Sequence, residues 1–372
     1  MTEGKEGLDE LRGAVREFLA AKSAESAVRA AMETGLHYDP AVWQLMAQQL
    51  RLPGLALPEE YGGDGFGLTE LGVVLEEMGA ALLCAPFFST VVLAAHALLE
   101  SGDQQACARY LPSIAAGRTV ATLAAAEGNA SWDPALVSAR AERAHRDGGW
   151  LLTGQKAFVI DGAIADLVLV VARSTAGPCL FAVDRGASGL RAEPMTTLDL
   201  TRSMAMLTFD QVPAVLVGAE GQAGRLMSRV LDLACVALAA EQAGGARRCL
   251  EMSADYARTR YQFGRPIGSF QAVKHKCADM LVRVELAEAT AREAARLAGE
   301  EAAEFPVAAA TAHICCSQAY LFAAMENIQV HGGIGFTWEH PAHLYFRRAK
   351  SSELLFGGPA VYHERLLDRL GI

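Results

Sequence analysis

Two stretches in the C-terminal third of the sequence contain residue types that can contact a phosphorylated ligand. The first reads Arg260-Tyr261-Gln262-Phe263-Gly264-Arg265-Pro266-Ile267 and is followed by Ser269-Phe270-Gln271. An arginine there offers a planar, permanently charged fork, which binds paired oxygen atoms in a way that lysine does not. Phe263 adds an apolar face and Gln271 a neutral hydrogen-bonding amide. The alternative is structural, because an arginine at the end of a helix can also form a surface ion pair.

The second stretch reads Gln329-Val330-His331-Gly332-Gly333-Ile334-Gly335-Phe336. Adjacent glycines allow backbone N–H groups to approach a ligand closely, since no Cβ atom stands in the way. The same pair could be an ordinary helix stop, because glycine commonly ends helices. Each stretch alone is therefore ambiguous, but the two together favour a binding site.

Three segments of different texture must position these residues, and we predict them as three domains of an α+β fold. Residues 1–118 show helical periodicity, which is interrupted by a Gly- and Pro-rich break at residues 57–65 and resumes over residues 69–99. Residues 119–216 contain short apolar runs between turns, as in a small β-barrel or sandwich. Residues 217–372 are helical again and suggest a four-helix bundle. The predicted strands are Leu136–Ala141, Trp150–Thr153, Leu167–Ala172, Cys179–Val183 and Met206–Phe209, with a turn at Asp147-Gly148-Gly149.

The composition limits the classes of function. The 372 residues are 52% hydrophobic and 20% charged, so a sizeable core can form and disorder is not expected. A formal net charge of -10 argues against a nucleic-acid partner, which would need a basic surface. We identify no signal peptide and no membrane span, and the eight cysteines lack the paired C-x-x-C spacing of a metal site. We therefore expect a cytoplasmic protein without a metal site.

Four stretches together resemble the acyl-CoA dehydrogenase family. The Arg260 stretch matches its R-x-x-F-G…F-Q signature, and the Gln329 stretch matches its Q-x-x-G-G-x-G element. The other two are Gly154-Gln155-Lys156, like the G-Q-K that opens a barrel strand, and Pro58-Glu59-Glu60-Tyr61-Gly62-Gly63. The resemblance covers essentially the whole chain. It implies an N-terminal helical domain, a middle β-barrel, a C-terminal four-helix bundle and an FAD cofactor.

In this family one subunit holds the isoalloxazine ring of FAD and a neighbour reaches the ADP half. The resemblance assigns the contacts of this chain to the ADP half, where Arg260 would pair with the pyrophosphate. Gly332 and Gly333 would bring backbone N–H groups to the cofactor. The predicted FAD-binding residues are Arg260, Gln262, Phe263, Ile267, Phe270, Gln271, Gln329, Gly332 and Gly333.

The catalytic base of the family has no counterpart in this sequence. The family removes the α-proton of an acyl-CoA thioester with a glutamate at one of two positions. Alignment places Phe356 at the common position and Ala234 at the alternative one, and neither side chain accepts a proton. Glu353 is interpreted as a surface or ion-paired residue, and Glu241 lies two helical turns beyond Ala234. We therefore predict no catalytic residue in this chain.

Contacts to the flavin ring are also replaced. The nearest match to the family's T-E-P-x-A-G-S-D reads Ala126-Glu127-Gly128-Asn129-Ala130-Ser131-Trp132-Asp133, with Ala126 for threonine and Trp132 for serine. Ile160 replaces the threonine of W-I-T, and Gly358 replaces a second flavin-contacting threonine. This pattern is similar to the non-catalytic subunit of heteromeric acyl-CoA dehydrogenases from actinobacteria that shorten steroid side chains.

The resemblance implies a partner, a substrate and an electron acceptor. The partner is a second acyl-CoA dehydrogenase-like subunit that carries the catalytic glutamate, in a heterotetramer with two copies of each chain. The substrate is an acyl-CoA, and electron-transfer flavoprotein is the acceptor. Two alternatives stay open: a self-sufficient homo-oligomeric flavoenzyme, with Glu353 or water as base or with oxygen-dependent chemistry, and a scaffold without FAD. Retention of Arg260 and Gln329 argues against the scaffold, and the loss of both base positions argues against self-sufficiency.

Overall fold

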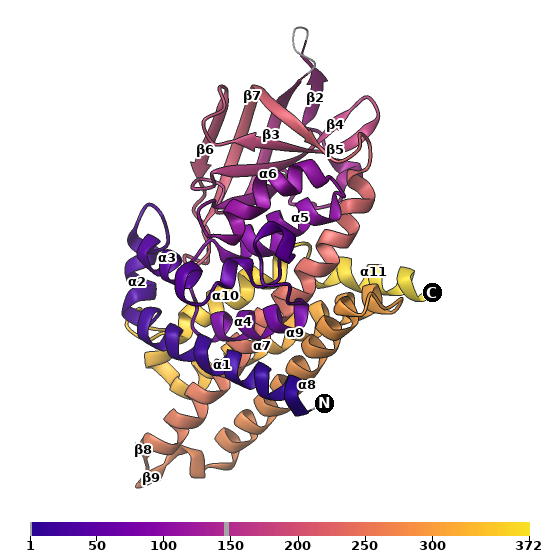
Figure 1. The fold of residues 1–372 in the computed structure, drawn as a ribbon. Coiled ribbons are helices and arrows are strands. Elements are labelled where there is room, and N and C mark those ends of the chain that lie inside the picture. Colours follow the sequence, from indigo (N-terminus) through magenta and orange to yellow (C-terminus); the bar gives the residue numbers. More distant parts are fainter. Residues whose placement is uncertain (1, 145–148) are drawn as a thin grey trace. The chain divides into compact units, whose positions relative to one another are not determined.

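The computed structural model describes residues 2–144 and 149–372, which form two compact units. The helical unit contains residues 2–32, 68–83 and 235–372, and the sheet unit contains residues 33–67 and 84–234. Figure 1 shows the predicted succession of helices, strands and helices, which confirms the α+β class. The N-terminal helices divide between the units, and the long helix α7 (Ala223–Thr259) runs through both. The predicted turn at Asp147-Gly148 lies outside the described residues.

The sheet unit is built on a seven-stranded sheet that closes on itself. Its order is β1-β4-β2-β3-β7-β5, β5 pairs back with β4, and β6 pairs with β7. The bounds are β1 (Ala121–Ala124), β2 (Arg140–Arg143), β3 (Trp150–Ile160), β4 (Leu167–Ser174), β5 (Gly177–Asp184), β6 (Leu190–Pro194) and β7 (Met204–Val217). The helical segments of this unit are α3 (Pro40–Gln49), the π-helix η3 (Phe88–Ala94), α5 (Ala95–Glu100) and α6 (Gln104–Ala115). This closure confirms the predicted barrel.

Four of the five predicted strands lie within β3, β4, β5 and β7, and the prediction for Leu136–Ala141 is wrong. Its first residue ends a 3-10 turn, and only Arg140 onward belongs to a strand. The Asp133 carboxylate accepts the Ala135 N–H, and the Glu127 carboxylate accepts the N–H of Ser138 and of Ala139. These carboxylates take up donors that a strand would use in its ladder. The short strands β1 and β6 were not predicted.

The helix predicted over residues 69–99 is interrupted in its middle. Helix α4 (Leu68–Ala80) ends before Leu82, which has a left-handed φ of 49°. The chain resumes a helical path after Pro86, as the π-helix η3 and then α5. Proline offers no backbone N–H, and the residue before it is pushed away from the helical region, so a continuous helix is disfavoured here.

In the helical unit, α4 and α7 cross with their backbones in contact. A Cβ atom added to Gly244 would collide with the carbonyl oxygen of Glu76, and one added to Gly79 would collide with the carbonyl oxygen of Glu241. Each glycine therefore accommodates the backbone of the opposite helix. Glycine in a helix is unfavourable by itself, so packing must explain both positions. This reciprocal pair fixes how α4 meets α7.

Further helices complete this unit. They are α1 (Thr2–Lys22), α2 (Glu25–Glu33), α8 (Gln271–Gly299), α9 (Phe305–His331), α10 (Ala342–Leu354) and α11 (Pro359–Leu370). By length and composition alone, the stretch Phe305–Phe336 could cross a membrane, although 56% of its most apolar window is buried inside the fold. Helix α9 packs against α8, α10 and α11, as expected of a helix at the centre of a bundle.

Candidate functional site

The Arg260 stretch forms a hairpin at the end of α7, which Figure 1 shows as the strands β8 (Tyr261–Gln262) and β9 (Arg265–Pro266). Its two turn residues, Phe263 and Gly264, have φ angles of 52° and 78°. Positive φ at both positions is the geometry of a type I′ hairpin turn. The Phe263 side chain lies at the tip and is 91% exposed. This turn therefore presents an aromatic ring to the outside.

Aromatic and backbone contacts hold the hairpin in place. The ring of Phe270 lies 6.0 Å from that of Phe263 in an edge-to-face arrangement, and the Arg265 guanidinium lies 4.1 Å from the Phe270 ring centroid. The N–H of Ile267 donates to the carbonyl oxygen of Arg260 at 2.8 Å. The backbone around Arg260 is thus ordered by groups within the hairpin.

The polar side chains of this region remain available to a ligand. Among residues 2–144 and 149–372, no hydrogen bond or ion pair involves the exposed side chain of Arg260, and the same holds for Gln271 and Gln329. A hollow of about 450 Å³ adjoins the hairpin, and its wall includes Arg258 and Lys274 but not Arg260. An unpaired guanidinium such as that of Arg260 suits an anionic ligand such as a pyrophosphate.

The Gln329 stretch lies at the same end of the bundle. Helix α9 ends at His331, and Gly332 follows with a positive φ of 65°. A Cβ atom added to Gly332 or Gly333 would meet no atom within 4 Å, so their backbone faces open space. The ring of Tyr256, one turn before Arg260, lies 4.4 Å from the ring of His331. This contact brings the two predicted binding stretches together.

The structure shows how accessible the nine predicted FAD-binding residues are. Ile267 and Phe270 are half-buried, while the exposed members are Arg260, Gln262, Phe263, Gln271, Gln329, Gly332 and Gly333. Phe336, which ends the Gln329 stretch, is 79% exposed. Apolar rings this exposed commonly mark a surface that another molecule covers. Most of the predicted FAD-binding residues are therefore accessible to a ligand.

The two residues that the motif alignment assigned to the base positions, Phe356 and Ala234, are buried and apolar. Phe356 is 1% exposed and has a φ of 66°, and Ala234 is fully buried. The two nearby acids are engaged elsewhere. Glu241 accepts a hydrogen bond from Arg348 at 2.9 Å, with both side chains buried, and Glu353 pairs with Lys350 one turn earlier in α10. The buried ion pair gives Glu241 a structural role.

In the sheet unit, the residues that the motif alignment predicted as replacements of flavin-ring contacts are buried and apolar. Ala126, Trp132 and Ile160 all lie in the core of this unit. The lysine of Gly154-Gln155-Lys156 is fully buried, and its ammonium donates to the Glu127 carboxylate at 2.8 Å and to the Ala125 carbonyl at 3.0 Å. The sequence motif included Lys156 but did not predict its partner, although Glu127 lies in the stretch 126–133 that was also matched to the family.

Glu127 accepts several hydrogen bonds. Besides Lys156, it accepts hydrogen bonds from the backbone and hydroxyl of Ser138 and from the backbone of Ala139. Burial would raise the pKa of Glu127, but the hydrogen bond and charge of Lys156 and the bonds from Ser138 and Ala139 lower it to about 2. This pair fixes the segment between β1 and β2.

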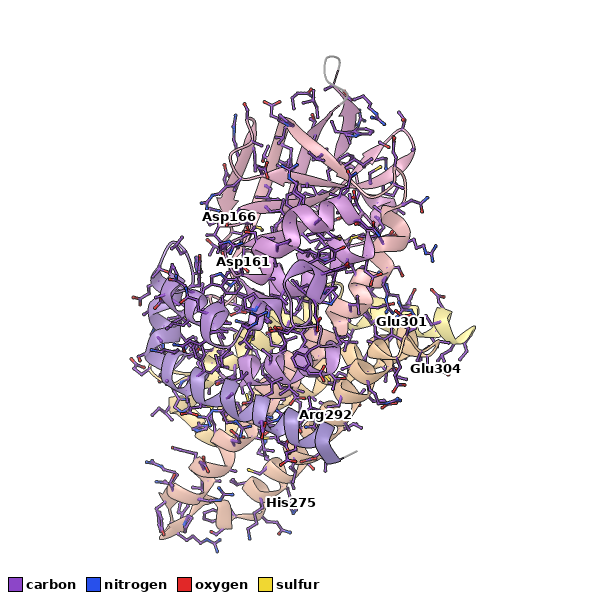
Figure 2. The ribbon with its side chains drawn as sticks, in the orientation of Figure 1. Asp161, Asp166, His275, Arg292, Glu301 and Glu304 are labelled. Atoms are coloured by element: carbon purple, nitrogen blue, oxygen red, sulfur yellow. The ribbon has the colours of Figure 1, made fainter. Side chains whose placement is uncertain are left out.

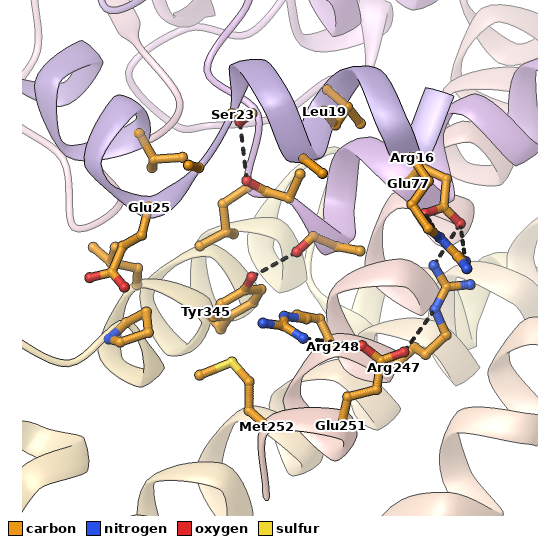
Figure 3. A pocket seen from close by; sticks show the side chains of 18 residues that line it. Arg16, Leu19, Ser23, Glu25, Glu77, Arg247, Arg248, Glu251, Met252 and Tyr345 are labelled. Carbon is orange, nitrogen blue, oxygen red and sulfur yellow. Dashed lines mark hydrogen bonds and ion pairs between the residues drawn. The ribbon is translucent and has the colours of Figure 1, made fainter. Parts of the chain in front are cut away.

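A second hollow, of about 390 Å³, opens between α1, α2, α4, α7 and α10 in the helical unit (Figure 3). At one end Glu77 accepts hydrogen bonds from Arg16 and Arg247. Burial would raise the pKa of Glu77, but these arginines lower it. Within the wall Glu251 also pairs with Arg248, whereas Glu25 pairs with Arg29, which lies outside the wall. The charges described in this wall therefore already have partners.

The same charges extend behind the hollow into a network that joins four helices. Glu76 and Glu77 of α4 are buried and pair with Arg12 of α1 and Arg247 of α7. Arg292 of α8, labelled in Figure 2, lies 3.6 Å from Glu76. Buried carboxylates are stable only when paired, so the arginines hold α1 and α8 against α4.

The whole chain matches models of one protein family. The match comprises "Acyl-CoA dehydrogenase, N-terminal domain" over residues 5–118, "middle domain" over residues 122–212 and "C-terminal domain" over residues 223–371. The chain therefore belongs to the acyl-CoA dehydrogenase family, as its motifs predicted. Family membership makes it an oxidoreductase of the flavoprotein type.

Relatives and solved structures match over nearly the full length. The chain is 36% identical to "Acyl-CoA dehydrogenase IpdE2" of Mycobacterium tuberculosis, over 96% of this chain and 95% of the relative. It is 34% identical to a chain in the structure of a variant of the "Tcur3481-Tcur3483 steroid ACAD", with a TM-score of 0.89 and coverage of 99% and 98%. It is 31% identical to a chain of the "ChsE4-ChsE5 complex from Mycobacterium tuberculosis", with a TM-score of 0.88 and coverage of 98% and 97%.

Proposed function

We propose that this chain is the cofactor-supporting subunit of a heteromeric, FAD-dependent acyl-CoA dehydrogenase. It contributes contacts to the ADP half of FAD, and a second family member supplies the catalytic glutamate. The observation that carries this proposal is a contrast within the chain. Arg260, Gln329 and Gly332 are open to a ligand, whereas Phe356 and Ala234 fill both base positions with buried apolar groups.

The residues present fit the ADP half of FAD. The unpaired Arg260 guanidinium can bind pyrophosphate oxygens, and the open backbone of Gly332 and Gly333 can approach the same group. Phe263 offers an apolar face beside them. When bound, FAD accepts the hydride that leaves the β-carbon of the acyl thioester. This chain would orient the cofactor, and the partner would remove the α-proton.

The proposed substrate is a CoA thioester of a steroid side chain, and the proposed acceptor is electron-transfer flavoprotein. Support for the substrate comes from the similarity over nearly the full chain to a structure described as a steroid acyl-CoA dehydrogenase. Support for a heteromer comes from the same structure and the ChsE4-ChsE5 complex, since both descriptions name two subunits. We propose the heterotetramer with two copies of each chain on the same basis.

The first test is the cofactor content of the chain alone and of the chain co-expressed with a partner that has an intact base. We expect little FAD with the chain alone and roughly one FAD for two chains in the complex, because symmetric assemblies repeat the shared site. Stoichiometric FAD in the isolated chain would show that it is self-sufficient.

The second test is Arg260→Lys in the complex. Lysine keeps the charge but loses the fork, and one charge-assisted hydrogen bond is worth about 1.5–3 kcal/mol, which is roughly ten- to a hundredfold in FAD affinity. Arg296→Lys is the matched control, because Arg296 forms exposed ion pairs with Glu293 and Glu300 near the C-terminal end of α8 and does not line the hollow. Equal FAD retention by both variants would assign Arg260 no role in cofactor binding.

The third test concerns the base. We expect Glu353→Gln to leave turnover of the complex within a fewfold of wild type, because its carboxylate pairs with Lys350. Loss of a general base typically costs about 10²–10⁴-fold, so the two outcomes are well separated. A hundredfold loss with FAD still bound would make this subunit catalytic. Glu241→Gln is less informative, since it leaves Arg348 buried without its partner carboxylate.

A further inference from the structure

Three histidines surround the segment that links α9 to α10. The ring of His331 lies between the rings of Tyr256 and His340, with centroid distances of 4.4 Å and 4.3 Å. His343 stacks on Trp338 with ring centroids 4.8 Å apart. All three histidines lie within the helical unit, and the residues between the first two include Gly332 and Gly333. The rings of His331 and His340 therefore flank the turn that carries the proposed cofactor contacts.

The hydrogen bonds define which nitrogen of each ring carries a proton. His331 donates from Nδ1 to the carbonyl oxygen of Asn327 at 2.8 Å. His340 instead accepts at Nδ1 the backbone N–H of Ala342, the first residue of α10, at 3.2 Å. An imidazolium has no free lone pair, so a proton on Nδ1 of His340 would break this bond. It would also place a positive charge at the N-terminus of a helix, where the helix dipole opposes it.

Burial and neighbouring positive charges oppose protonation of these rings as well. Burial lowers the pKa of His331, and burial together with the neighbouring His331 lowers the pKa of His340. Burial also lowers the pKa of His343, whose Nε2 donates to the Trp338 carbonyl. Arg29 of α2 and Arg347 of α10 lie 5.7 and 5.6 Å from the Trp338 ring. Glu25 of α2 and the exposed Glu339 are the nearby negative charges, and Tyr256 is the titratable group on α7.

We propose that His331 and His340 are positioning residues that hold the Gly332–Phe336 turn while both rings are neutral, and that protonation of His340 releases it. The two rings are in direct contact, so a positive charge on one disfavours a positive charge on the other. Releasing His340 from Ala342 would also free the start of α10. The turn is therefore ordered at neutral pH and loosens in mild acid.

The direction of the pH dependence follows from the pKa shifts. A histidine in the unfolded chain titrates near pH 6.5, and each of these rings titrates lower in the folded chain. The arrangement of the rings is fully stable above about pH 6.5, and its stability is lost as the pH falls below that value. Each histidine that must take up a proton to open the turn shifts the equilibrium constant between the closed and the open turn by up to about tenfold per pH unit.

The test is hydrogen–deuterium exchange of the full-length protein, comparing the peptide that contains residues 329–345 at pH 6.5 and 5.5 after correction for the intrinsic exchange rate. We expect protection of the Gly332–Phe336 amides to fall by up to about tenfold if His340 alone takes up a proton, and by up to about a hundredfold if His331 takes one up as well. His340→Asn supplies an acceptor that does not titrate, because an asparagine oxygen readily accepts the N–H two residues on. We expect this variant to lose up to about tenfold less protection than wild type.

His275→Asn is the matched control, because His275 lies exposed on α8 (Figure 2). This control should behave like wild type. Equal protection of the wild-type turn at the two pH values would overturn the proposal, as would equal losses in wild type and His340→Asn. FAD retention by the complex should decline over the same pH range, and only this last expectation rests on the proposed function. Acid-sensitive exchange without FAD binding would uphold the role of the histidines and refute the cofactor role.

Discussion

The ion pair between Glu127 and Lys156 gives a quantitative prediction for the sheet unit. Lys156 is fully buried, and the Glu127 carboxylate that faces it also holds Ser138 and Ala139. In Glu127→Gln the ammonium keeps only the Ala125 carbonyl as partner. Removal of one member of a buried pair typically costs about 3–5 kcal/mol, because the other charge is left uncompensated. The Glu127 carboxylate retains some solvent contact, so we expect about 3 kcal/mol at pH 7.

The same variant carries a pH signature. The pKa of Glu127 is about 2 in the fold against an ordinary value of 4.5. A depressed carboxylate pKa stabilises the fold above about pH 4.5, and this stabilisation is lost as the pH falls toward 2. Glutamine does not titrate, so the difference between wild type and Glu127→Gln should shrink by up to about 1.4 kcal/mol per pH unit below 4.5.

The assay is urea unfolding at pH 7, 5 and 3.5, followed by tryptophan fluorescence, since Trp43, Trp132 and Trp150 lie in the sheet unit. Lys156→Met and the double variant complete a mutant cycle that isolates the coupling between the two charges. Lys156→Met should cost less than Glu127→Gln, because it removes the buried charge itself and leaves Glu127 its contacts with Ser138 and Ala139. A cost below about 1 kcal/mol for Glu127→Gln, or a cost that does not change with pH, would refute this account of the pair.

Three other predictions concern the helical unit. Gly244→Ala should destabilise the protein by about 3 kcal/mol in thermal unfolding, because the added Cβ meets the Glu76 carbonyl. Gly224→Ala is the control and should not destabilise α7, because open space surrounds Gly224. Equal effects of the two variants would exclude backbone contact as the cause. Glu77→Gln should lower the free energy of unfolding in urea by about 3–5 kcal/mol, because it leaves buried charges without their partner. Arg16→Gln, at the exposed edge of the same ion pair, should lower it by less than about 1 kcal/mol. The reverse order would contradict the network. Cys249, whose pKa burial raises, should react with a thiol reagent only after unfolding, and rapid labelling of the native protein would show that the core around it opens.

The sequence predicted the parts of the site that are local in the chain. Arg260, Phe263 and Gln271 lie within one hairpin and its following helix, so their spacing alone indicates that they share a surface. The two base positions could also be assigned from motif spacing. Positions of this kind can be predicted because residues close together in the chain must also lie close together in the structure.

Relations between distant segments could not be predicted. Lys156 finds Glu127 across 29 residues, and the contact between Tyr256 and His331 joins the ends of two helices. The strand prediction over Leu136–Ala141 failed for a related reason, since the Glu127 carboxylate accepts backbone donors that the residue pattern assigned to a ladder. The burial of Glu241 with Arg348 likewise depends on how α7 packs against α10. Tertiary partners of this kind override local propensity.

The exposed rings of Phe263 and Phe336 have a consequence for the fate of the chain in the cell. Chaperones and proteases act on apolar surface that a native assembly would cover. Under the proposed function, a chain made in excess of its partner would be recognised through these rings, and its steady-state level would follow the supply of the partner. The hairpin proposed to contact the cofactor would then also keep the two subunits at matched abundance.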